Sequence, residues 1–384
     1  MGSPKILFIS HNASRSGAPM VLLQFMAWIG HKYPETTLDS VLLIGGPLEQ
    51  DFKRYSRNVF RLNSYENQVS QFKRLLRKVL NRLGIGLRSP HEKLLKHLGA
   101  VNYDLIYANT IVSLPIANKI KDVSNNCRLV CHVHELNTII KNLLPNFNDY
   151  IPAVDNFLVV SNLVKQNLIE NWFIPSNKLR LVYEFTNLSS KKKATKVPSD
   201  TFIVGGSGMV YWRKGYDLFI QVALMMNNKY PDQNIQFIWV GGDGGDNEIM
   251  DIILADIHKS GLEDMVFFVG EQEYPEIYYQ NFDVFLMTSR EDPFPLVCIE
   301  VAMVNKPIIC FKGATGTEEI LEYGGGFIVP YLDVQSMCER IIYYINNPKI
   351  RMEDGEKAKH LFSNFTPENM CPKIYNHIEV LLKE

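Results

Sequence analysis

The sequence lacks several features that identify whole classes of protein. It has no run of eighteen apolar residues, the length that a membrane-spanning helix needs, so we expect no membrane span. Its 40 Lys and Arg residues and 41 Asp and Glu residues nearly cancel, which leaves no overall field to attract nucleic acid. It has no GxGxxG motif, which disfavours a nicotinamide-dependent dehydrogenase. Because residues 1–4 lead directly into an apolar run, we expect no signal peptide and a cytoplasmic location.

Cysteine is also scarce, with six residues scattered through a chain of 384. Only Cys127 and Cys131 have a spacing found in metal sites, and no second pair matches them. Disulfide frameworks belong to short secreted chains that are dense in cysteine. We therefore expect reduced thiols and no zinc site.

The sequence does contain a regular alternation of short apolar runs and helical patterns, which predicts mostly parallel sheets with helices on their faces. A chain of this length is too long for one ordinary core. The predicted strands are Lys5–Ser10, Val41–Ile44, Leu105–Ala108, Leu129–His134, Phe157–Val160, Leu179–Val182, Phe202–Val204, Phe237–Val240, Val266–Val269, Phe282–Met287, Ile308–Phe311 and Phe327–Val329.

A polar, basic stretch without periodicity, Thr186–Asp200, separates these strands into two series and is the predicted linker. We therefore predict an α/β protein with two doubly wound, Rossmann-like domains that face a cleft, where a small molecule can bind. The predicted domains are residues 1–187 and residues 188–365. Residues 366–384 are predicted to form a final helix that packs back on the first domain.

The acidic stretch Ser289–Glu300 is the main candidate for a site. It follows a predicted buried strand and leads into a helix, and ligands bind at this edge of open α/β sheets. Asp292 lies near the helix start and Glu300 about two turns later, so both carboxylates can face one ligand. Acidic residues at a helix start also complement the helix dipole, and this alternative stays open.

A glycine-rich stretch, Gly205–Gly208, precedes two cations, Arg213 and Lys214. Glycines after a strand let the backbone approach a ligand closely, and two cations beside exposed N–H groups suit a diphosphate. The alternative is a plain glycine turn with two solvated cations. The position at the carboxyl end of a strand favours phosphate binding.

The first half contains weaker candidates. Ser16 and Gly17 lie in a loop between a strand and a helix, where a ligand role and a plain turn are equally open. His132 and His134 share one predicted strand, and we expect them to face opposite sides of the sheet. His134, at the end of that strand, is the better candidate for a site, although either histidine can be purely structural.

Residues 72–97 are strongly basic, with a single acid and a leucine stripe at helical spacing. A basic amphipathic helix of this kind can lie on an anionic membrane surface, which predicts peripheral contact with the inner membrane face. The alternative, which the pattern favours slightly, is a solvated helix whose leucines pack on the domain.

Four segments resemble the retaining GT-B glycosyltransferases of the family-4 type, and the resemblance covers nearly the whole chain. Ser16–Pro19 is similar to the N-terminal glycine loop of that family, and His132–Glu135 is similar to its central histidine segment. Arg213–Asp217 resembles its Lys-Gly-x-Asp segment, and Asp292–Glu300 resembles its E-x7-E motif.

The resemblance implies transfer of a hexose from a nucleotide diphosphate sugar to a hydroxyl of a glycan or lipid-linked acceptor in polysaccharide synthesis. It also implies that residues 1–187 form the acceptor-side domain and residues 188–365 the nucleotide-sugar-binding domain. UDP-glucose is the first choice of donor because it is frequent in the family. The implied catalytic residues are His134 near the reacting sugar, Lys214 at the donor diphosphate and Asp292 at the hydroxyls of the donor sugar. The implied donor-binding residues are Gly17, Gly208, Arg213, Lys214, Asp292, Phe294, Pro295, Leu296, Val297 and Glu300, the last accepting hydrogen bonds from the ribose.

Because these side chains would neutralise the diphosphate, the resemblance implies no metal and no other cofactor. The chain also departs from the family pattern. Asp292 replaces a glutamate, Pro293 and Pro295 replace glycines, and Met209 and Val210 stand where an arginine is usual. Two alternatives follow: a nucleotide-sugar-binding module without chemistry, or another enzyme of this architecture, such as an epimerase or a phosphorylase.

Overall fold

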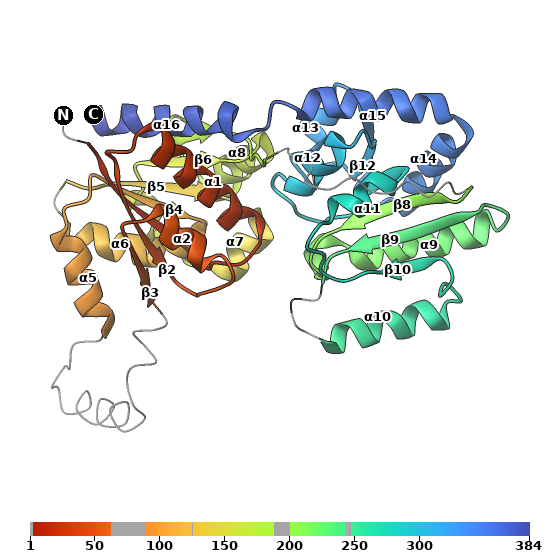
Figure 1. Ribbon diagram of the computed structural model, residues 1–384, viewed down its shortest axis with the longest axis horizontal. Coiled ribbons are helices and arrows are strands. Elements are labelled where there is room, and N and C mark those ends of the chain that lie inside the picture. The colour runs from red at the N-terminus through yellow and green to blue at the C-terminus, as the bar shows by residue number, and fades with distance from the viewer. Residues whose placement is uncertain (1–2, 63–89, 125, 188–199, 243, 245–246) are drawn as a thin grey trace. The chain divides into compact units, whose positions relative to one another are not determined.

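The computed structural model describes residues 3–62, 90–124, 126–187, 200–242, 244 and 247–384. The chain forms two compact units (Figure 1). The first unit comprises the chain up to Val160, Val164–Val182 and Pro367–Glu384. The second unit comprises Ser161–Leu163 and Tyr183–Thr366.

The first unit is built on a parallel sheet that has seven strands among the described residues, in the order β3-β2-β1-β4-β5-β6-β7. The strands are β1 (Lys5–Ser10), β2 (Thr37–Leu42), β3 (Asn58–Arg61), β4 (Leu105–Asn109), β5 (Arg128–Val133), β6 (Asn156–Val159) and β7 (Leu179–Leu181). All five residues of β4 are buried, as expected for a central parallel strand that helices cover on both faces. The order changes direction at β1, which places the ends of β1 and β4 at a switch point of the sheet.

The helices of this unit are α1 (Gly17–Lys32), α2 (Glu49–Tyr55), α5 (Pro90–Ala100), α6 (Leu114–Asp122), α7 (Asn137–Leu143), α8 (Asn162–Trp172) and α16 (Pro367–Lys383). The C-terminal helix α16 packs against α1 (Figure 1). Tyr375 on α16 stacks on Tyr33, the residue that follows α1, with ring centroids 4.2 Å apart. The end of the chain therefore belongs to the same core as its beginning.

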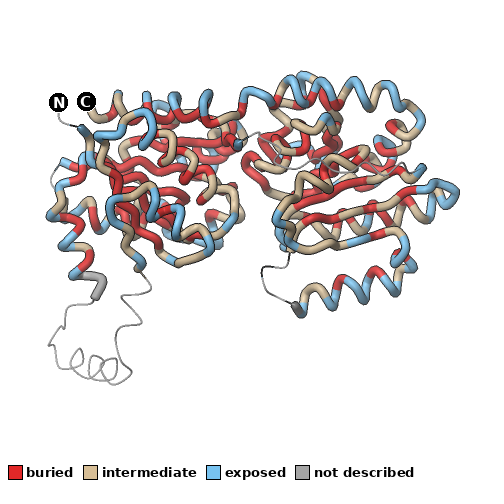
Figure 2. The backbone as a smooth tube through the Cα atoms, viewed as in Figure 1, coloured by how far each residue is buried: buried red, intermediate tan, exposed pale blue. Residues whose placement is uncertain are grey.

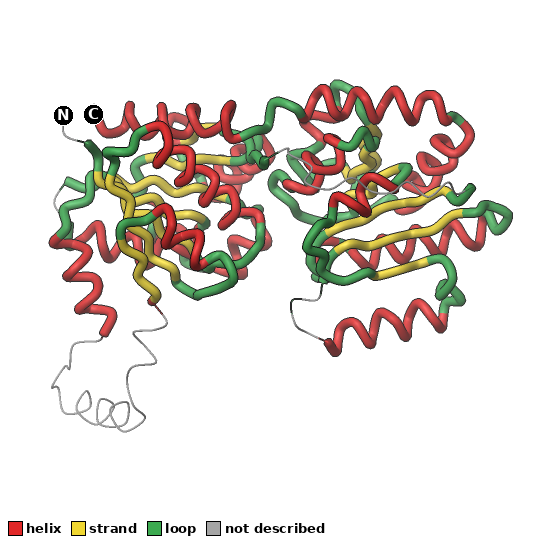
Figure 3. The backbone as a smooth tube through the Cα atoms, in the orientation of Figure 1, coloured by secondary structure: helices red, strands yellow, loops and turns green. Residues whose placement is uncertain are grey.

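The second unit also has helices around a sheet (Figure 3). Its parallel sheet has six described strands in the order β10-β9-β8-β11-β12-β13. The strands are β8 (Phe202–Ser207), β9 (Ile235–Val240), β10 (Val266–Phe268), β11 (Val284–Met287), β12 (Ile308–Phe311) and β13 (Gly326–Val329). The helices are α9 (Tyr216–Lys229), α10 (Asn247–Lys259), α11 (Glu276–Asn281), α12 (Leu296–Met303), α13 (Glu318–Leu321), α14 (Val334–Asn346) and α15 (Pro348–Phe362). The predicted pair of doubly wound α/β domains is confirmed.

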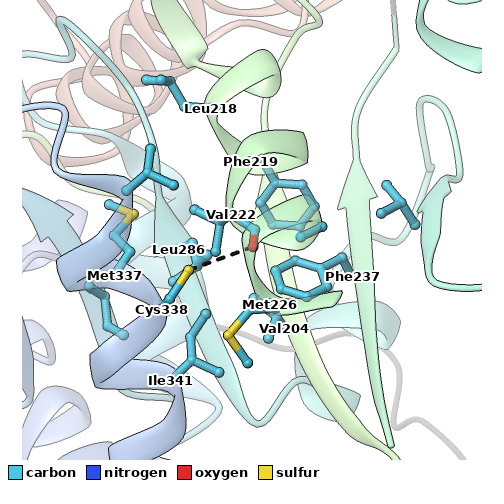
Figure 4. Close-up of a cluster of buried hydrophobic side chains, with 14 of the residues drawn as sticks. Val204, Leu218, Phe219, Val222, Met226, Phe237, Leu286, Met337, Cys338 and Ile341 are labelled. Atoms are coloured by element: carbon cyan, nitrogen blue, oxygen red, sulfur yellow. Dashed lines mark hydrogen bonds between the residues drawn. The ribbon is translucent and has the colours of Figure 1, made fainter. Parts of the chain in front are cut away.

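The core of the second unit lies between its sheet and α9 and α14 (Figure 4). Phe219 on α9 packs edge to face against Phe237 on β9, and the thiol of Cys338 donates to the carbonyl oxygen of Val222 at 3.6 Å. Figure 2 shows that the strands of both units are mostly buried while the outer faces of the helices are exposed. All six cysteines are buried and none forms a disulfide.

The glycines of β8 correct one prediction. Gly205 and Gly206 were expected in a loop, but both belong to the strand. A Cβ on Gly205 would lie 2.0 Å from the ring of Phe282, and one on Gly206 would lie 2.6 Å from Trp239. These glycines therefore make room for aromatic rings in the core, and only Gly208 lies in the loop beyond the strand.

Strand β2 starts earlier than predicted, and β3 was not predicted at all. Asp39 interrupts the apolar pattern of β2, yet it is fully buried. It accepts hydrogen bonds from Arg57 at 2.6 Å and from the hydroxyl of Tyr103 at 2.7 Å. A paired charge can occupy a strand interior, and pattern alone cannot reveal the pairing partner.

The basic segment 72–97 lies largely outside the described residues, which resume at Pro90 with α5. Where the structure is described, none of its helices is both long and apolar enough to span a bilayer.

Candidate functional site

The candidate site of the second unit is built on the loops that follow β8 and β11. The loop after β8 contains a single 3-10 turn, Trp212–Lys214, and ends at Gly215, where α9 begins. Gly215 has φ 70°, and a Cβ there would lie 1.9 Å from the carbonyl oxygen of Thr288, just after β11. Only glycine fits this position, so the loop after β8 lies directly against the end of β11.

This contact brings three of the predicted residues together. Asp292 is 5% exposed and accepts a hydrogen bond from Lys214 Nζ at 2.5 Å. Arg213 Nη1 lies 3.2 Å from the other carboxylate oxygen of Asp292 and also donates to the carbonyl oxygen of Glu291 at 2.9 Å. The backbone adds a further link, because the N–H of Arg290 donates to the carbonyl oxygen of Arg213 at 2.8 Å.

The negative charge of Asp292 is stabilised by the positive charges of Lys214 and Arg213. Burial alone would raise the pKa of Asp292, but the charges of Lys214 and Arg213 outweigh it and hold the pKa below its usual value. Asp292 is therefore ionised at neutral pH. Two positive charges face one negative charge, which leaves excess positive charge where an anion can be bound.

Glu184 is a member of this neighbourhood that the sequence analysis missed. It is 6% exposed, and its pKa is raised to about 8 by burial and by the charge of Asp292, against the opposing charges of Lys214 and Arg213. The sequence feature that could have revealed Glu184 is its position as a single acidic residue within the apolar run that follows β7. A carboxyl group that is largely protonated at neutral pH can donate a hydrogen bond.

Glu300 lies on α12 and has a different environment from that of Asp292. Burial raises its pKa to about 7, and the charge of Glu276 adds to the effect. The pKa of the buried Tyr279 hydroxyl is in turn raised by burial and by Glu300, and this hydroxyl lies 2.9 Å from Ser207 Oγ at the end of β8. Glu300 can therefore change its charge near neutral pH while Asp292 stays ionised.

The segment Phe294–Val297 combines a buried aromatic ring with the N-terminus of α12. The ring of Phe294 is 2% exposed and packs between Tyr183 and Phe365, with centroids 5.1 and 5.0 Å away. The helix starts at Leu296, after Pro295. The first N–H groups of a helix, here those of Leu296 and Val297, have no acceptor within the helix and can donate to a ligand.

The first unit holds the other predicted residues, Gly17 and His134. Gly17 is the first residue of α1. His134 Nε2 lies 3.1 Å from Asn109 Oδ1, and Asn109 Nδ2 donates to the carbonyl oxygen of Ala18 at 3.0 Å. The fully buried Asn109 thus ties the first turn of α1 to His134, and the sequence analysis did not assign it a role.

The expected opposite orientation of His132 and His134 is wrong. Their ring centroids are 4.1 Å apart, because side chains two residues apart on a strand point to the same face. Burial and the charge of His11 lower the pKa of His134 to about 3, and burial and His134 lower that of His132 well below its usual value. Both imidazoles are neutral at pH 7 and can act through hydrogen bonds only.

Among the described residues, no three His, Cys, Asp or Glu side chains lie together in a way that could hold a metal ion. Asp243 and Asp246, in the glycine-rich loop after β9, lie outside the described residues.

Comparisons with known proteins agree with this architecture. Residues 50–190 match the model of Glycosyltransferase Family 4, and residues 189–361 match the model of Glycosyl transferases group 1. The O-antigen biosynthesis glycosyltransferase WclY of Escherichia coli is 31% identical over 222 residues, which cover 56% of this chain and 59% of WclY. The lipopolysaccharide core biosynthesis mannosyltransferase LpcC of Rhizobium leguminosarum is 28% identical over 185 residues, 47% of this chain and 51% of LpcC.

The chain spans about half the length of the first curated relatives that it matches. A solved structure gives fuller coverage: that of Anabaena Alr3699/HepE in complex with UDP-glucose has a TM-score of 0.79 and 19% identity, over 98% of this chain and 100% of HepE. At this identity the likeness shows a shared fold. Since the two family models adjoin and together span residues 50–361, the chain belongs to the GT-B glycosyltransferases of the family-4 type.

Proposed function

We propose that the protein transfers a hexose, with retention of configuration, from a nucleotide diphosphate sugar to a hydroxyl group of a glycan or lipid-linked acceptor. UDP-glucose is the proposed donor, and the proposed pathway is the synthesis of a polysaccharide. The transfer uses no metal, because side chains supply the positive charge that the diphosphate requires.

The observation that carries the proposal is the cluster of Arg213, Lys214 and Asp292 at the carboxyl end of the second sheet. Two cations held in place by a buried carboxylate are a preorganised site for a diphosphate. Asp292 and the N–H groups at the start of α12 would hold hydroxyls of the donor sugar. Glu300 would accept hydrogen bonds from the ribose.

The similar proteins support the same chemistry. The HepE structures contain UDP, glucose and UDP-glucose, and they share the fold of this chain. The names of WclY and LpcC refer to the synthesis of O-antigen and of lipopolysaccharide core, and both are called transferases of sugars. An envelope glycan is therefore the proposed class of acceptor.

In the proposed reaction, the bond between the anomeric carbon and the β-phosphate oxygen breaks, and its electron pair stays on the phosphate. Lys214 and Arg213 stabilise the negative charge that develops there. The acceptor oxygen bonds to the anomeric carbon from the same face. Its proton passes to the departing phosphate oxygen, so no side chain has to act as nucleophile or base.

A thermal-shift series tests donor binding. UDP-glucose should stabilise the protein by about 2.7 kcal/mol at a concentration one hundred times its dissociation constant, and other nucleotide sugars should stabilise it less. The products then separate the alternatives. Free glucose or a glycoside indicates transfer, an isomerised nucleotide sugar indicates an epimerase, and binding without any product indicates a module that has no chemistry. The absence of stabilisation by every nucleotide sugar would refute the proposal.

Donor affinity should depend on pH through Glu300. Since its pKa is raised to about 7, the carboxyl group is mostly protonated at lower pH and accepts hydrogen bonds from ribose well only above pH 7. Affinity for intact UDP-glucose should therefore rise by up to about ten-fold between about pH 6 and about pH 8. The donor itself does not titrate in this range, because both of its phosphates are esterified.

Isothermal titration at several pH values measures this effect, and Glu300→Gln is its control. Glu184 also titrates in this pH range. The contribution of Glu300 is therefore the change of affinity with pH in the wild type minus the change in Glu300→Gln. Parallel profiles for the wild type and for Glu300→Gln would show that Glu300 does not contact the ribose.

A further inference from the structure

The 3-10 turn that carries both cations of the site is held by the segment that follows β11. Arg290 Nη1 donates to the carbonyl oxygen of Trp212 at 2.8 Å, and the N–H of Arg290 donates to that of Arg213 at 2.8 Å. Thr288 Oγ1 donates to the carbonyl oxygen of Lys214 at 3.3 Å. Every carbonyl oxygen of the turn therefore accepts a hydrogen bond from this segment, and two of the three donors belong to Arg290.

The side chain of Arg290 is itself fixed by a second partner. It forms a bidentate pair with Asp217 in the first turn of α9, with Nη1 and Nη2 at 2.8 and 2.7 Å from the two carboxylate oxygens. Its guanidinium also lies 5.3 Å from the centroid of the Trp212 ring. The planar fork of arginine can make these bonds at the same time, whereas the single charged nitrogen of lysine cannot. Arg290 thus links the turn, the start of α9 and the segment after β11.

Arg290 is unsuited to bind an anion itself. Its side chain is 12% exposed, and both of its terminal nitrogens already donate to the protein. Its charge is matched by Asp217, whereas the charges of Arg213 and Lys214 together face the single carboxylate of Asp292. The side chain of Asp217 is 38% exposed, so this ion pair adds little stability and mainly orients the guanidinium. Arg290 can therefore act on an anion only through the turn.

We propose that Arg290 is a positioning residue of the donor site: it holds the turn so that Arg213 and Lys214 stay in place beside Asp292. The role of Asp217 is to orient Arg290. The proposal rests on the proposed function, in which the two cations bind the diphosphate of the donor. A misplacement of about 1 Å can cost about 10²-fold in rate, so a residue that touches no substrate can still control the reaction.

The sign of one effect separates positioning from simple electrostatics. Asp217→Asn removes a negative charge near the cations, which by Coulomb's law alone would strengthen the binding of an anion. If Asp217 orients Arg290, the same change should instead weaken binding, by about three-fold. Arg290→Met should weaken binding by about ten-fold. Adding Asp217→Asn to Arg290→Met should cause no further loss, because Asp217 acts through Arg290.

Isothermal titration with UDP and with GDP measures these affinities without turnover, and the nucleotide that the wild type binds more tightly is the probe. Arg290→Lys keeps the charge but not the fork, so it should bind the probe about as weakly as Arg290→Met does. Thermal unfolding shows whether each variant is folded. If Arg290→Met does not fold, the sign of the effect in Asp217→Asn decides the question.

Arg351→Met is the matched control. Arg351 Nη2 lies 3.3 Å from a carboxylate oxygen of Asp283, and its guanidinium lies 4.9 Å from the centroid of the Phe202 ring. These contacts are of the same kinds as those of Arg290, but they lie at the opposite end of the sheet, because Phe202 begins β8 and Asp283 precedes β11. The affinity of this variant for the probe should equal that of the wild type.

The two proposals fail in different ways. The positioning role is overturned if folded Arg290→Met or Arg290→Lys binds the probe as tightly as the wild type, or if Asp217→Asn binds it as tightly or more tightly. Such results, together with sugar transfer by the wild type, would leave the glycosyl transfer intact. The expected losses of affinity without any transfer of sugar would keep the positioning role at a diphosphate site and refute the glycosyl transfer. If the wild type binds neither nucleotide, both proposals are refuted.

Discussion

Replacing Lys214 with alanine is expected to lower kcat/KM for a nucleotide-sugar donor by about 10²–10³-fold, the usual effect of removing one donor from a developing anion. Lys214 Nζ already lies within hydrogen-bond distance of a carboxylate at the end of the sheet, so its position does not depend on the substrate. A charge that is in place before the reaction stabilises the leaving group without reorganisation. Arg213 stays behind in the variant, which explains why some activity should remain.

Steady-state kinetics with acceptor, or donor hydrolysis without it, measures this loss. Lys214→Arg should retain part of the activity because it keeps the charge. Lys229→Ala is the matched control, since Lys229 is an exposed lysine at the far end of α9, and its kcat/KM should not change. Thermal unfolding of each variant separates lost chemistry from lost folding. Wild-type turnover in a folded Lys214→Ala protein would remove Lys214 from the mechanism.

The second large effect is expected on stability, in Gly215→Ala. The left-handed conformation of this residue costs a non-glycine side chain about 1–2 kcal/mol. The added Cβ would also lie 1.9 Å from the carbonyl oxygen of Thr288, so the start of α9 would have to move away from the end of β11. We expect the free energy of unfolding to fall by about 3 kcal/mol or more, within the range of strongly destabilising substitutions.

Gly261→Ala provides the matched comparison. Gly261 has a similar φ of 66°, but a Cβ there would meet no atom within 4 Å. Gly261→Ala should lower the free energy of unfolding only by the cost of the left-handed backbone for alanine, about 1–2 kcal/mol. Urea denaturation gives both values, and the difference between them measures the steric contact at Thr288. Equal losses in the two variants would mean that the loop can move away from β11 at little cost.

The alternation of apolar runs was enough to predict the two parallel sheets, because strands buried on both faces have a continuous apolar pattern. It failed where a polar group is satisfied by a distant partner, as at Asp39 with Arg57 and Tyr103. It also failed at Gly205, whose role is to leave room for the ring of Phe282. Both errors concern contacts between residues far apart in the chain, which a local pattern does not contain.

The candidate site could be predicted only in part, because a local pattern shows which residues follow a strand but not which distant residues meet there. Lys214 and Asp292 were found because each follows a strand, and the carboxyl ends of parallel strands share one edge. Glu184 was missed because its altered pKa comes from burial and from Asp292, more than one hundred residues away. Asn109 was not assigned a role because its side chain acts through hydrogen bonds to Ala18 and His134, which are distant in the sequence.

The burial of all six cysteines has a practical consequence. Burial raises the pKa of each thiol, to about 12 for Cys127, Cys298 and Cys338, so thiolate is scarce at neutral pH and maleimide reagents should react slowly with the native protein. A cysteine introduced on an exposed helix would then be the preferred attachment point for a dye. One such position in each unit would allow energy transfer between fluorophores to test whether the distance between the two units changes when a ligand is added, without first removing the native sulfur atoms.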